Sequence, residues 1–382
     1  MTRALLLDTS FAARPIHDWL LEEGFEVWTI GNRPQDVLAR RDARHYLQDN
    51  YADAVVVQSH VDRLDIDCVV PGCTDVSIET ALRLRLKKTV LDTPDTYQKI
   101  ADKSAFRALC AELDLPSPRR VFMEDLPVQG KLIAKPSDAF SGHGISVFDG
   151  ADRAAGLRAL TTARAESRNG EALLETYIDG QLHSYSAFLE DRKVAEAAIV
   201  REDGSVTPFA VDTSYVVNDF PADGIAAVKS AVERLAQALH LVDGLLHVQF
   251  IWDGKKPWLI ELTRRCPGDL YPWLVELSTG QRHAARYASY FVGRQVRRGE
   301  PVVRRHILRH TLTAGHANYE ALWFREATPV LEFHPLATSG REVPPNGRID
   351  RVGLLFLEYQ TESALREGHG RFLGRTSYRT AV

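Results

Sequence analysis

Apolar residues occur in short runs separated by helical patterns over the first 95 residues. Each run has the length of a buried strand, and Ile16, Trp19 and Leu20 between the first two runs share one face of a helix. Strands that alternate with helices are typical of a parallel sheet covered by helices. We therefore predict an N-terminal parallel βαβ domain over 1–95. Its predicted strands are 4–7, 25–30 and 68–72, with a helix over 77–86 and a further unit through 54–57.

A different pattern follows, in which several strands come close together. Residues 95–116 read as one helix, and Pro116 and Pro118 open a new segment. From about residue 225, apolar positions at helical spacing mark a strong amphipathic helix, and Asp253-Gly254 joins two strands as a hairpin. We expect strands at 131–135, 145–148, 172–175, 185–189, 246–252 and 258–262, with a helix over 151–168.

The end of the chain, after about residue 300, is rich in proline, glycine and arginine. This composition predicts short strands, of which 352–359 is the clearest, and the last fifteen or so residues are polar and expected to be loosely held. We therefore expect three parts. They are the N-terminal domain at 1–95, a middle domain at 96–300 with a lid subdomain at about 117–185, and a small β-rich C-terminal module at 301–382.

The composition is that of an ordinary globular protein: of 382 residues, 45% are apolar and 26% are charged. The formal net charge of −4 gives no basic surface for nucleic acid, so no nucleic-acid partner is expected. No apolar run approaches the roughly 18 residues needed to cross a membrane, and the first run stops at Asp8, too early for a signal peptide. The four cysteines have no CxxC spacing, which indicates reduced thiols and a cytoplasmic protein.

A lysine at the end of a predicted strand introduces the candidate chemistry. Lys135 closes the run 131–135, and a loop with two serines and two glycines, Gly142 and Gly144, follows. Glycines allow the backbone to approach a ligand closely, and a lysine beside such a loop supplies positive charge for phosphate oxygens. A strand end with a surface lysine and an ordinary turn explains this segment equally well.

Two further segments are compatible with a nucleotide site. Glu175 ends an apolar strand, and Tyr177 and Ile178 follow before the turn at Gly180. Such an extended segment can offer backbone groups to an adenine edge, with apolar side chains beside the ring. Lys103, at the start of a helix, is placed to reach phosphates. Taken alone, each segment is better explained as ordinary structure: a strand with its turn, and a solvated lysine.

The two hairpin strands bring oxygen donors to one place. Gln249 lies on the first strand and Glu261 on the second, where they can project to the same side. A small number of oxygen ligands suits Mg²⁺, which completes its shell with water and phosphate oxygens. Arg265 lies two residues beyond Thr263 and can bind a carboxylate or an acyl phosphate bidentately. The alternative is a structural ion pair within Glu261–Arg265.

In their order and spacing, these segments resemble the ATP-grasp superfamily over nearly the whole chain. Each motif is loose alone, but five in family order are specific. The arrangement is most like the carboxylate–amine ligases, such as L-amino acid ligases, and like biotin carboxylases and carbamoyl-phosphate synthases. The fold class it implies is α/β: a parallel N-terminal domain, a lid, and an antiparallel ATP-grasp core with its C-terminal module. The motifs are Lys103, Lys135, the glycine loop, Glu175-x-Tyr177-Ile178 and Glu261-x-Thr263-x-Arg265.

The resemblance also implies roles for individual residues. Lys103 and Lys135 would bind the phosphates of ATP, and Lys135 and Arg265 would act in catalysis. Mg²⁺, with Mn²⁺ as an alternative, would be the metal cofactor. The lid loop would be Ser141, Gly142, His143 and Gly144; the adenine site Glu175, Tyr177 and Ile178; and the metal ligands Gln249, Glu261 and Thr263.

Some nucleotide and metal positions depart from the family pattern. Leu182 stands where the ligases carry a glutamate for the ribose. The adjacent His183, as in biotin carboxylases, is expected either to face the nucleotide or to be an ordinary strand histidine. Gln249 replaces the first metal carboxylate, as in carbamoyl-phosphate synthases, and Thr263 replaces an asparagine. One metal is then weakly held unless Asp269 compensates.

The expected substrate site departs from the pattern as well. Arg264 replaces a proline, and we expect it to bind an anionic substrate together with Arg265 and Ser214. Arginines at the start of the last module are expected either to face the cleft or to form a solvated basic surface. They are Arg304, Arg305 and Arg309, followed by His310.

The function that the resemblance implies is ATP-dependent ligation of a small-molecule carboxylate to an amine. An acyl phosphate would form first, and the amine would then give an amide, with ADP and phosphate released. Amino acids or short peptides are the expected substrates, and a homodimer through the N-terminal domain is expected by analogy. Two alternatives stay open: a carboxylase that uses bicarbonate as the acid, and a degenerate member that binds nucleotide without catalysis.

Overall fold

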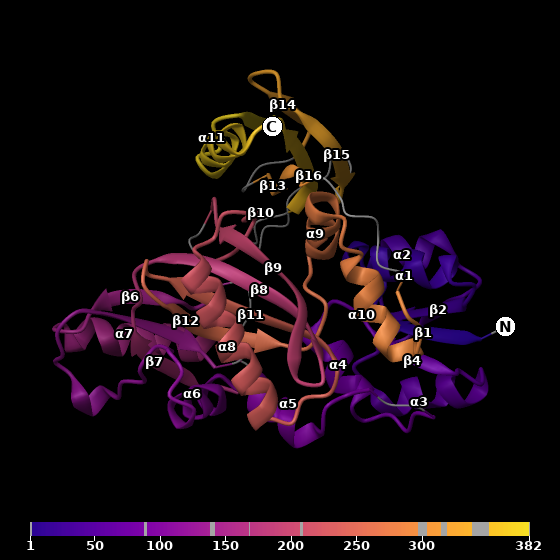
Figure 1. The fold of residues 1–382 in the computed structure, drawn as a ribbon, viewed down its shortest axis with the longest axis horizontal. Coiled ribbons are helices and arrows are strands. Elements are labelled where there is room, and N and C mark those ends of the chain that lie inside the picture. The colour runs from indigo at the N-terminus through magenta and orange to yellow at the C-terminus, as the bar shows by residue number, and fades with distance from the viewer. Residues whose placement is uncertain are drawn as a thin grey trace.

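Three sheets make up most of the computed structural model, which describes residues 2–87, 90–137, 142–167, 169–206, 209–296, 304–314, 319–337 and 351–381. A parallel sheet near the N-terminus, a three-stranded lid sheet and a central eight-stranded sheet follow one another along the chain. In Figure 1 the lid sheet lies to the left of the central sheet and the N-terminal sheet to its lower right. The mixed α/β fold class expected from the sequence is confirmed.

The N-terminal sheet is parallel, as the alternating pattern predicted. Its strand order is β3-β2-β1-β4, and every described pairing in it is parallel. The run 54–57 lies in a helix, and the helix expected over 77–86 is shorter. The strands are β1 (Arg3–Leu7), β2 (Glu26–Gly31), β3 (Tyr46–Gln48) and β4 (Cys68–Pro71), and the helices η1 (Phe11–Ala13), α1 (Arg14–Glu22), α2 (Val37–Arg41), α3 (Ala54–Arg63) and α4 (Asp75–Ala81).

Two helices occupy the segment 95–116, where the apolar spacing predicted one. They are α5 (Pro94–Ala101) and α6 (Lys103–Glu112). Asp102 between them has an extended backbone, and its carboxylate accepts a hydrogen bond from the Ala105 backbone N–H at 2.7 Å. An aspartate in this position is a strong helix N-cap, so it ends one helix and starts the next with Lys103 in the first turn.

The lid sheet is antiparallel and is covered by one helix. Its order is β6-β5-β7, with β5 in the middle. Apolar residues of the sheet and of helix α7 form a small core of their own, which includes Leu132, Leu160 and Leu174. The elements are β5 (Lys131–Pro136), β6 (Ser146–Asp149), β7 (Ala172–Thr176), α7 (Arg153–Glu166) and the short η2 (Met123–Asp125).

The central sheet is antiparallel at every described pairing, in the order β12-β11-β8-β9-β10-β13-β16-β15. Helices α5, α6 and α8 (Ala222–Ala238) pack on one face of it, and α9 (Tyr271–Thr279) and α10 (His283–Val292) pack on the other. Its strands are β8 (Gln181–Glu190), β9 (Lys193–Asp203), β10 (Thr213–Val216), β11 (Gly244–Trp252), β12 (Pro257–Thr263), β13 (His306–Thr313), β15 (Val330–Pro335) and β16 (Arg351–Tyr359).

The described segment after residue 301 contributes strands to two sheets. Its strands β13, β16 and β15 extend the central sheet, because β13 pairs with β10. The expectation of a loosely held C-terminus is wrong: α11 (Glu362–Leu373) buries Phe372 at 1% exposure, and β17 (Tyr378–Ala381) pairs with β14 (Ala321–Phe324). The helices of the described residues include none with the length and apolarity to cross a membrane.

Two buried histidines make the stability of this fold sensitive to acid. His283 and His310 are 2% and 0% exposed, and burial lowers the pKa of each to about 3. Their folded pKa values are below the ordinary 6.5, so the unfolded chain takes up protons first as the pH falls. Each neutral ring therefore contributes its full stability at a pH above the ordinary pKa. This contribution is lost as the pH falls toward the lowered pKa of the folded protein.

We predict that a His283→Gln variant loses less stability than the wild type between about pH 7 and about pH 5. The difference should be about 2 kcal/mol, because one proton-binding group has been removed from the unfolded chain. Urea unfolding at a series of pH values measures it. Exposed His240 is the control position, because His240→Gln should leave the pH dependence unchanged. Parallel pH profiles for the wild type and His283→Gln would contradict the prediction.

Candidate active site

Two of the expected site residues, Lys103 and Glu261, lie where helix α6, the lid strand β5 and the hairpin strand β12 meet. The Nζ of Lys103 donates to the backbone oxygen of Ser137 at 3.4 Å and lies 3.9 Å from Oε2 of Glu261. Ser137 directly follows the strand that carries Lys135. Residues that are far apart in the sequence thus place Lys103 beside Glu261, and the charge of Glu261 also acts on Lys135.

Lys135 is part of a buried group of three charges. Glu175 on β7 is 0% exposed, and its carboxylate accepts from Lys135 Nζ at 3.0 Å and from Arg107 Nε at 2.6 Å. Burial would raise the pKa of Glu175, but the two cations outweigh it and the pKa is lowered. The pKa of Lys135 is lowered, chiefly by burial. The Glu175 side chain is therefore held by cations of the protein itself.

Arg107 was not among the residues expected from the sequence. It lies on α6 and is 5% exposed, between the buried residues Phe106 and Cys110. The sequence did contain a signal for it, an arginine on the apolar side of an amphipathic helix. A guanidinium buried there needs a carboxylate partner.

Gln249 and Glu261 are direct cross-strand partners in the hairpin β11–β12. Their side chains therefore share one face of the sheet. Nε2 of Gln249 donates to Oε2 of Glu202 on β9 at 2.6 Å, so the amide oxygen is the atom that remains for a metal. The Glu261 side chain is about half exposed, at 49%. These two residues are brought together as the sequence predicted.

Glu202 is a second residue that the sequence analysis missed. It is 5% exposed, and burial raises the pKa of its carboxyl group to about 7, against the hydrogen bonds from Ser184 and Gln249. Its neighbour two residues earlier on β9, Val200, is fully buried on the same face. The sequence signal that could have identified Glu202 is a glutamate at an inward-facing position of a strand.

A magnesium ion suits the donors that are present, provided that other ligands complete its shell. Among the described residues, no group of three or more histidine, cysteine, aspartate or glutamate side chains is arranged to hold a metal ion. Glu261 and Gln249 supply two hard oxygen atoms, and Mg²⁺ is commonly held by one or two carboxylates together with substrate phosphates and water. Lys103 beside Glu261 would then face the same phosphates.

The end of β12 is tied to the N-terminal domain through Arg265. Its Nε and Nη2 donate to the two carboxylate oxygens of Asp75 at 2.8 and 3.2 Å, and Asp75 lies in the first turn of α4. Burial would lower the pKa of Arg265, but Asp75 outweighs it and the pKa is raised. The hydroxyl of Thr263 also donates to Asp75, at 3.4 Å. Asp75 of α4 thus holds the Arg265 guanidinium just beyond the end of β12.

We predict that an Asp75→Ala variant is destabilised by about 1.5–3 kcal/mol, because the bidentate charged hydrogen bonds to Arg265 are lost. Asp75→Asn, which keeps one acceptor oxygen, should be destabilised less. Urea denaturation with both variants measures the effect. If Asp75→Ala is as stable as the wild type, the ion pair does not join the two parts.

Arg264 does not take the substrate-binding place expected for it. Its guanidinium is 7% exposed, and Nε donates to Asp92 at 2.7 Å while Nη2 donates to the Val242 backbone oxygen at 2.6 Å. Both groups are internal to the protein, so Arg264 joins the chain before α5 to the segment just before β11. This structural role replaces the expected contact with an anionic substrate.

His183 is placed on the opposite face of the central sheet from Gln249 and Glu261. Cross-strand partners share a face, and His183 pairs with Phe250 while the adjacent Ser184 pairs with Gln249. The ring of His183 stacks on Phe250 at 5.5 Å, Nδ1 bonds to the Gln181 backbone oxygen, and burial lowers its pKa to about 4. These contacts are those of an ordinary buried strand histidine.

The lid loop is described in part. Gly142 and Gly144 have φ angles of +73° and +69°, which favour glycine, and His143 between them is exposed. A Cβ on Gly142 would lie 2.8 Å from the Phe209 backbone, so the loop touches the β9–β10 connection. Ser141 lies outside the described residues.

The expected adenine segment follows β7 directly. The Tyr177 backbone N–H donates to the Lys131 backbone oxygen at 3.0 Å, and Tyr177 and Ile178 are half-buried. Ser214 on β10, expected at the substrate site, is fully buried and accepts a hydrogen bond from Arg309 Nε at 2.9 Å. The structure gives Ser214 a charged partner that the sequence did not indicate.

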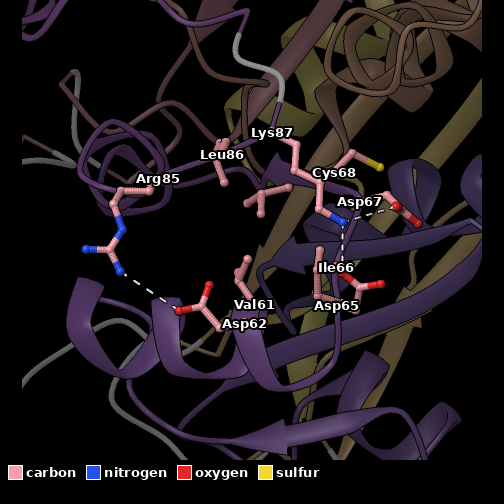
Figure 2. Close-up of a pocket in the computed structure, with 10 residues that line it drawn as sticks. Val61, Asp62, Asp65, Ile66, Asp67, Cys68, Arg85, Leu86 and Lys87 are labelled. Carbon is pink, nitrogen blue, oxygen red and sulfur yellow. Dashed lines mark hydrogen bonds and ion pairs between the residues drawn. The ribbon is translucent and has the colours of Figure 1, made fainter.

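A cavity of about 230 Å³ lies elsewhere, between α3, β4 and the segment after α4. Figure 2 shows its charged side chains paired with one another. Lys87 lies between Asp65 and Asp67, at 2.8 and 3.6 Å, and Arg85 lies 3.9 Å from Asp62. None of the expected site residues lines it, so this cavity is separate from the candidate active site.

Comparison with known proteins gives the following similarities. No family model matches the chain. The large chain of carbamoyl phosphate synthase from Deinococcus radiodurans is 22% identical over 263 residues, which are 65% of this chain. That alignment spans 25% of the relative, so this chain matches about a quarter of the length of the curated relatives.

Solved structures resemble almost the whole chain. Phosphoribosylglycinamide synthetase from Anaerococcus prevotii has a TM-score of 0.75 at 15% identity, covering 100% of this chain and 99% of that one. L-amino acid ligase from Bacillus licheniformis also has 0.75 at 15%, with 100% and 98% covered. The biotin carboxylase domain of 2-oxoglutarate carboxylase from Hydrogenobacter thermophilus, solved with MgADP and bicarbonate, has 0.77 at 12%, with 100% and 90% covered.

These proteins differ in substrate but share one architecture with this chain. The parallel N-terminal sheet, the lid sheet and the central antiparallel sheet follow in the order that the sequence motifs led us to expect. The chain therefore has the ATP-grasp fold.

Proposed function

We propose that this protein is an ATP-dependent carboxylate–amine ligase. The observation that carries the proposal is the position of Lys103 Nζ, 3.9 Å from Oε2 of Glu261 in the Gln249–Glu261 pair, with the charge of Glu261 also acting on Lys135. Two cations opposite one carboxylate and one amide suit a phosphate chain with its magnesium ion. The likeness to L-amino acid ligase makes amino acids or short peptides the favoured substrates.

The reaction that we propose has two steps. A substrate carboxylate oxygen attacks the γ-phosphorus of ATP, and ADP leaves as the acyl phosphate forms. An amine then attacks the acyl carbon, phosphate leaves with the electron pair of the broken C–O bond, and the amine loses a proton. Mg²⁺ would supply charge neutralisation at the phosphates.

The residues of this chain would act mainly by positioning and by charge. Lys135 and Lys103 would hold the phosphates, and Arg265 would steady the acyl phosphate from the side of the N-terminal domain. The lid loop at Gly142–Gly144 would keep water from the intermediate. Adenine would bind beside Tyr177 and Ile178. A homodimer and a cytoplasmic location are part of the same proposal.

The decisive experiment is a phosphate-release screen with MgATP over paired amino acids, with mass spectrometry of the products. Ligation predicts phosphate release that requires both an acid and an amine, together with a product of the corresponding amide mass. ATP binding without turnover across the whole panel would contradict the proposal and favour a degenerate nucleotide-binding protein.

Bicarbonate as the acid is the second candidate. It is supported by the similarity to carbamoyl phosphate synthase and by the carboxylase domain solved with bicarbonate. The sequence feature that also favours bicarbonate is Gln249, the partner of Glu261 among the expected metal ligands. Phosphate release that depends on bicarbonate and needs no amino acid would favour this candidate over amino acid ligation.

A further inference from the structure

Glu202 is a buried carboxylate that lies beside the expected metal ligands. It is 5% exposed on β9, and its Oε2 accepts a hydrogen bond from Nε2 of Gln249 at 2.6 Å. Glu261 is the cross-strand partner of Gln249, and its negative charge also acts on Glu202. The three side chains therefore form one group, in which Glu202 has no role that the sequence motifs assigned.

The contact between Glu202 and Gln249 crosses a whole strand. Because β8 lies between β9 and β11, the strands of the two residues are about 10 Å apart. Ser184 on β8 pairs with Gln249 and with Val200, which stands two positions before Glu202, so these side chains share one face of the sheet. Both long side chains extend toward each other over β8, and this gives the Gln249 side chain a defined direction.

The hydrogen bond decides which atom of the Gln249 amide is left for a metal. An ionised carboxylate can only accept hydrogen bonds, so the NH₂ group turns toward Glu202 and the oxygen turns away from it. Among the described residues, no donor binds that oxygen. The reverse orientation would present N–H donors to the metal, and Mg²⁺ takes oxygen ligands.

The same contact explains why position 249 carries an amide. A carboxylate there would lie at hydrogen-bond distance from the Glu202 carboxylate, and two adjacent negative charges disfavour each other. A glutamine satisfies both neighbours, since its nitrogen binds Glu202 and its oxygen is left for a metal. The departure from the family pattern at Gln249 is therefore matched by a second residue on a different strand.

We propose that Glu202 is a positioning residue for the metal site, which orients the Gln249 amide and makes an amide, rather than a carboxylate, the fitting ligand at position 249. This inference rests on the proposed function only for a magnesium–nucleotide complex at Gln249 and Glu261. It does not depend on which substrates are ligated. Replacing the residues that orient metal ligands typically lowers metal affinity by about 10- to 100-fold.

The binding test measures the affinity for ADP by calorimetry, once with Mg²⁺ and once with EDTA. The ratio of the two affinities is the metal-dependent gain. Gln249→Leu should reduce this gain, because an oxygen ligand is lost. Glu202→Met should reduce it by about 10-fold or more, while an unchanged affinity for ADP in EDTA shows that the variant is folded. Glu202→Gln keeps an acceptor oxygen, so a smaller loss is expected.

Asp203 provides the matched control on the same strand. It directly follows Glu202, so its side chain lies on the opposite face, where its Oδ1 accepts from the Gln181 amide at 3.1 Å. Asp203→Asn should therefore leave the metal-dependent gain unchanged. A wild-type gain in Glu202→Met, together with a reduced gain in Gln249→Leu, overturns the inference alone. Absence of any gain in the wild type overturns the proposed metal site, and the inference with it.

An exchanged pair gives the second test. Gln249→Glu should lower the midpoint of urea unfolding, because two carboxylates then meet over β8. Adding Glu202→Gln should raise the midpoint by more than the same change does in the wild type, since donor and acceptor have exchanged places. The metal-dependent gain of this double variant should at least equal that of the wild type. If Glu202→Gln shifts the midpoint equally in both backgrounds, the two residues are not matched and the proposal fails.

Discussion

Replacing Lys135 by alanine should lower kcat for substrate-dependent ADP release by about 100- to 1,000-fold, the usual loss when one preorganised donor to a developing charge is removed. Lys135 is the buried cation of the lid strand β5, and its Nζ is held 3.0 Å from Glu175. A coupled assay for ADP with saturating MgATP measures the change.

The structure also indicates why this variant should stay folded. Loss of Lys135 leaves Glu175 paired with Arg107 at 2.6 Å, one anion with one cation. A thermal melt should therefore resemble that of the wild type. Lys193→Ala is the control, because Lys193 is largely exposed and pairs with the surface residue Glu233. Wild-type turnover in Lys135→Ala would remove Lys135 from the proposed active site.

Glu175→Gln should be the most destabilising of the single substitutions considered, by about 3–5 kcal/mol, because it leaves two buried cations without their anion. Both Arg107 and Lys135 donate to this carboxylate, which is 0% exposed. Urea unfolding at neutral pH measures the difference. The gap between wild type and variant should shrink as the pH falls below 4.5, the ordinary pKa, because the folded pKa of Glu175 is lowered.

A surface ion pair provides the matched control for Glu175. Asp65 pairs with Lys87 at 2.8 Å, but both side chains are more than half exposed. Asp65→Asn should therefore change the free energy of unfolding far less than Glu175→Gln does. Equal stability losses for Glu175→Gln and Asp65→Asn would show that the buried group of three charges contributes no more than a surface pair.

Local patterns predicted much of the fold and part of the site. The alternation of strands and helices over 1–95 was sufficient for the parallel sheet, and the Asp253-Gly254 turn was sufficient for the hairpin that makes Gln249 and Glu261 partners. The paired hairpin residues are close in sequence, so turn chemistry determines their geometry, and the regular alternation of strands and helices favours parallel pairing.

Contacts between distant segments could not be predicted in this way. Arg107 and Glu175 are 68 positions apart, and Arg264 and Asp92 are 172 positions apart. Whether an arginine faces a substrate or a buried carboxylate depends on such pairs, which is why Arg264 was assigned to the wrong environment. The same limit applied to helix α6. Its apolar residues predicted a helix, but they did not predict that Glu175 is the partner of Arg107.

The pairing of the last strands could not be predicted for a related reason. The composition of the end of the chain suggested a small module. In the structure β13 pairs with β10 and β16 pairs with β13, so both strands belong to the central sheet, and the pairing of β13 with β10 joins residues more than 90 positions apart. A strand that completes a sheet formed by other segments carries little local signal of where it pairs.

The continuity of the central sheet has a practical consequence for shortened versions of the protein. A fragment that stops near residue 300 would lack β13, and β10 would then present an open edge with unpaired backbone groups. Such edges pair readily with other chains. The ATP-grasp core of this protein should thus self-associate when it is cut at the point where sequence composition alone suggests a domain border.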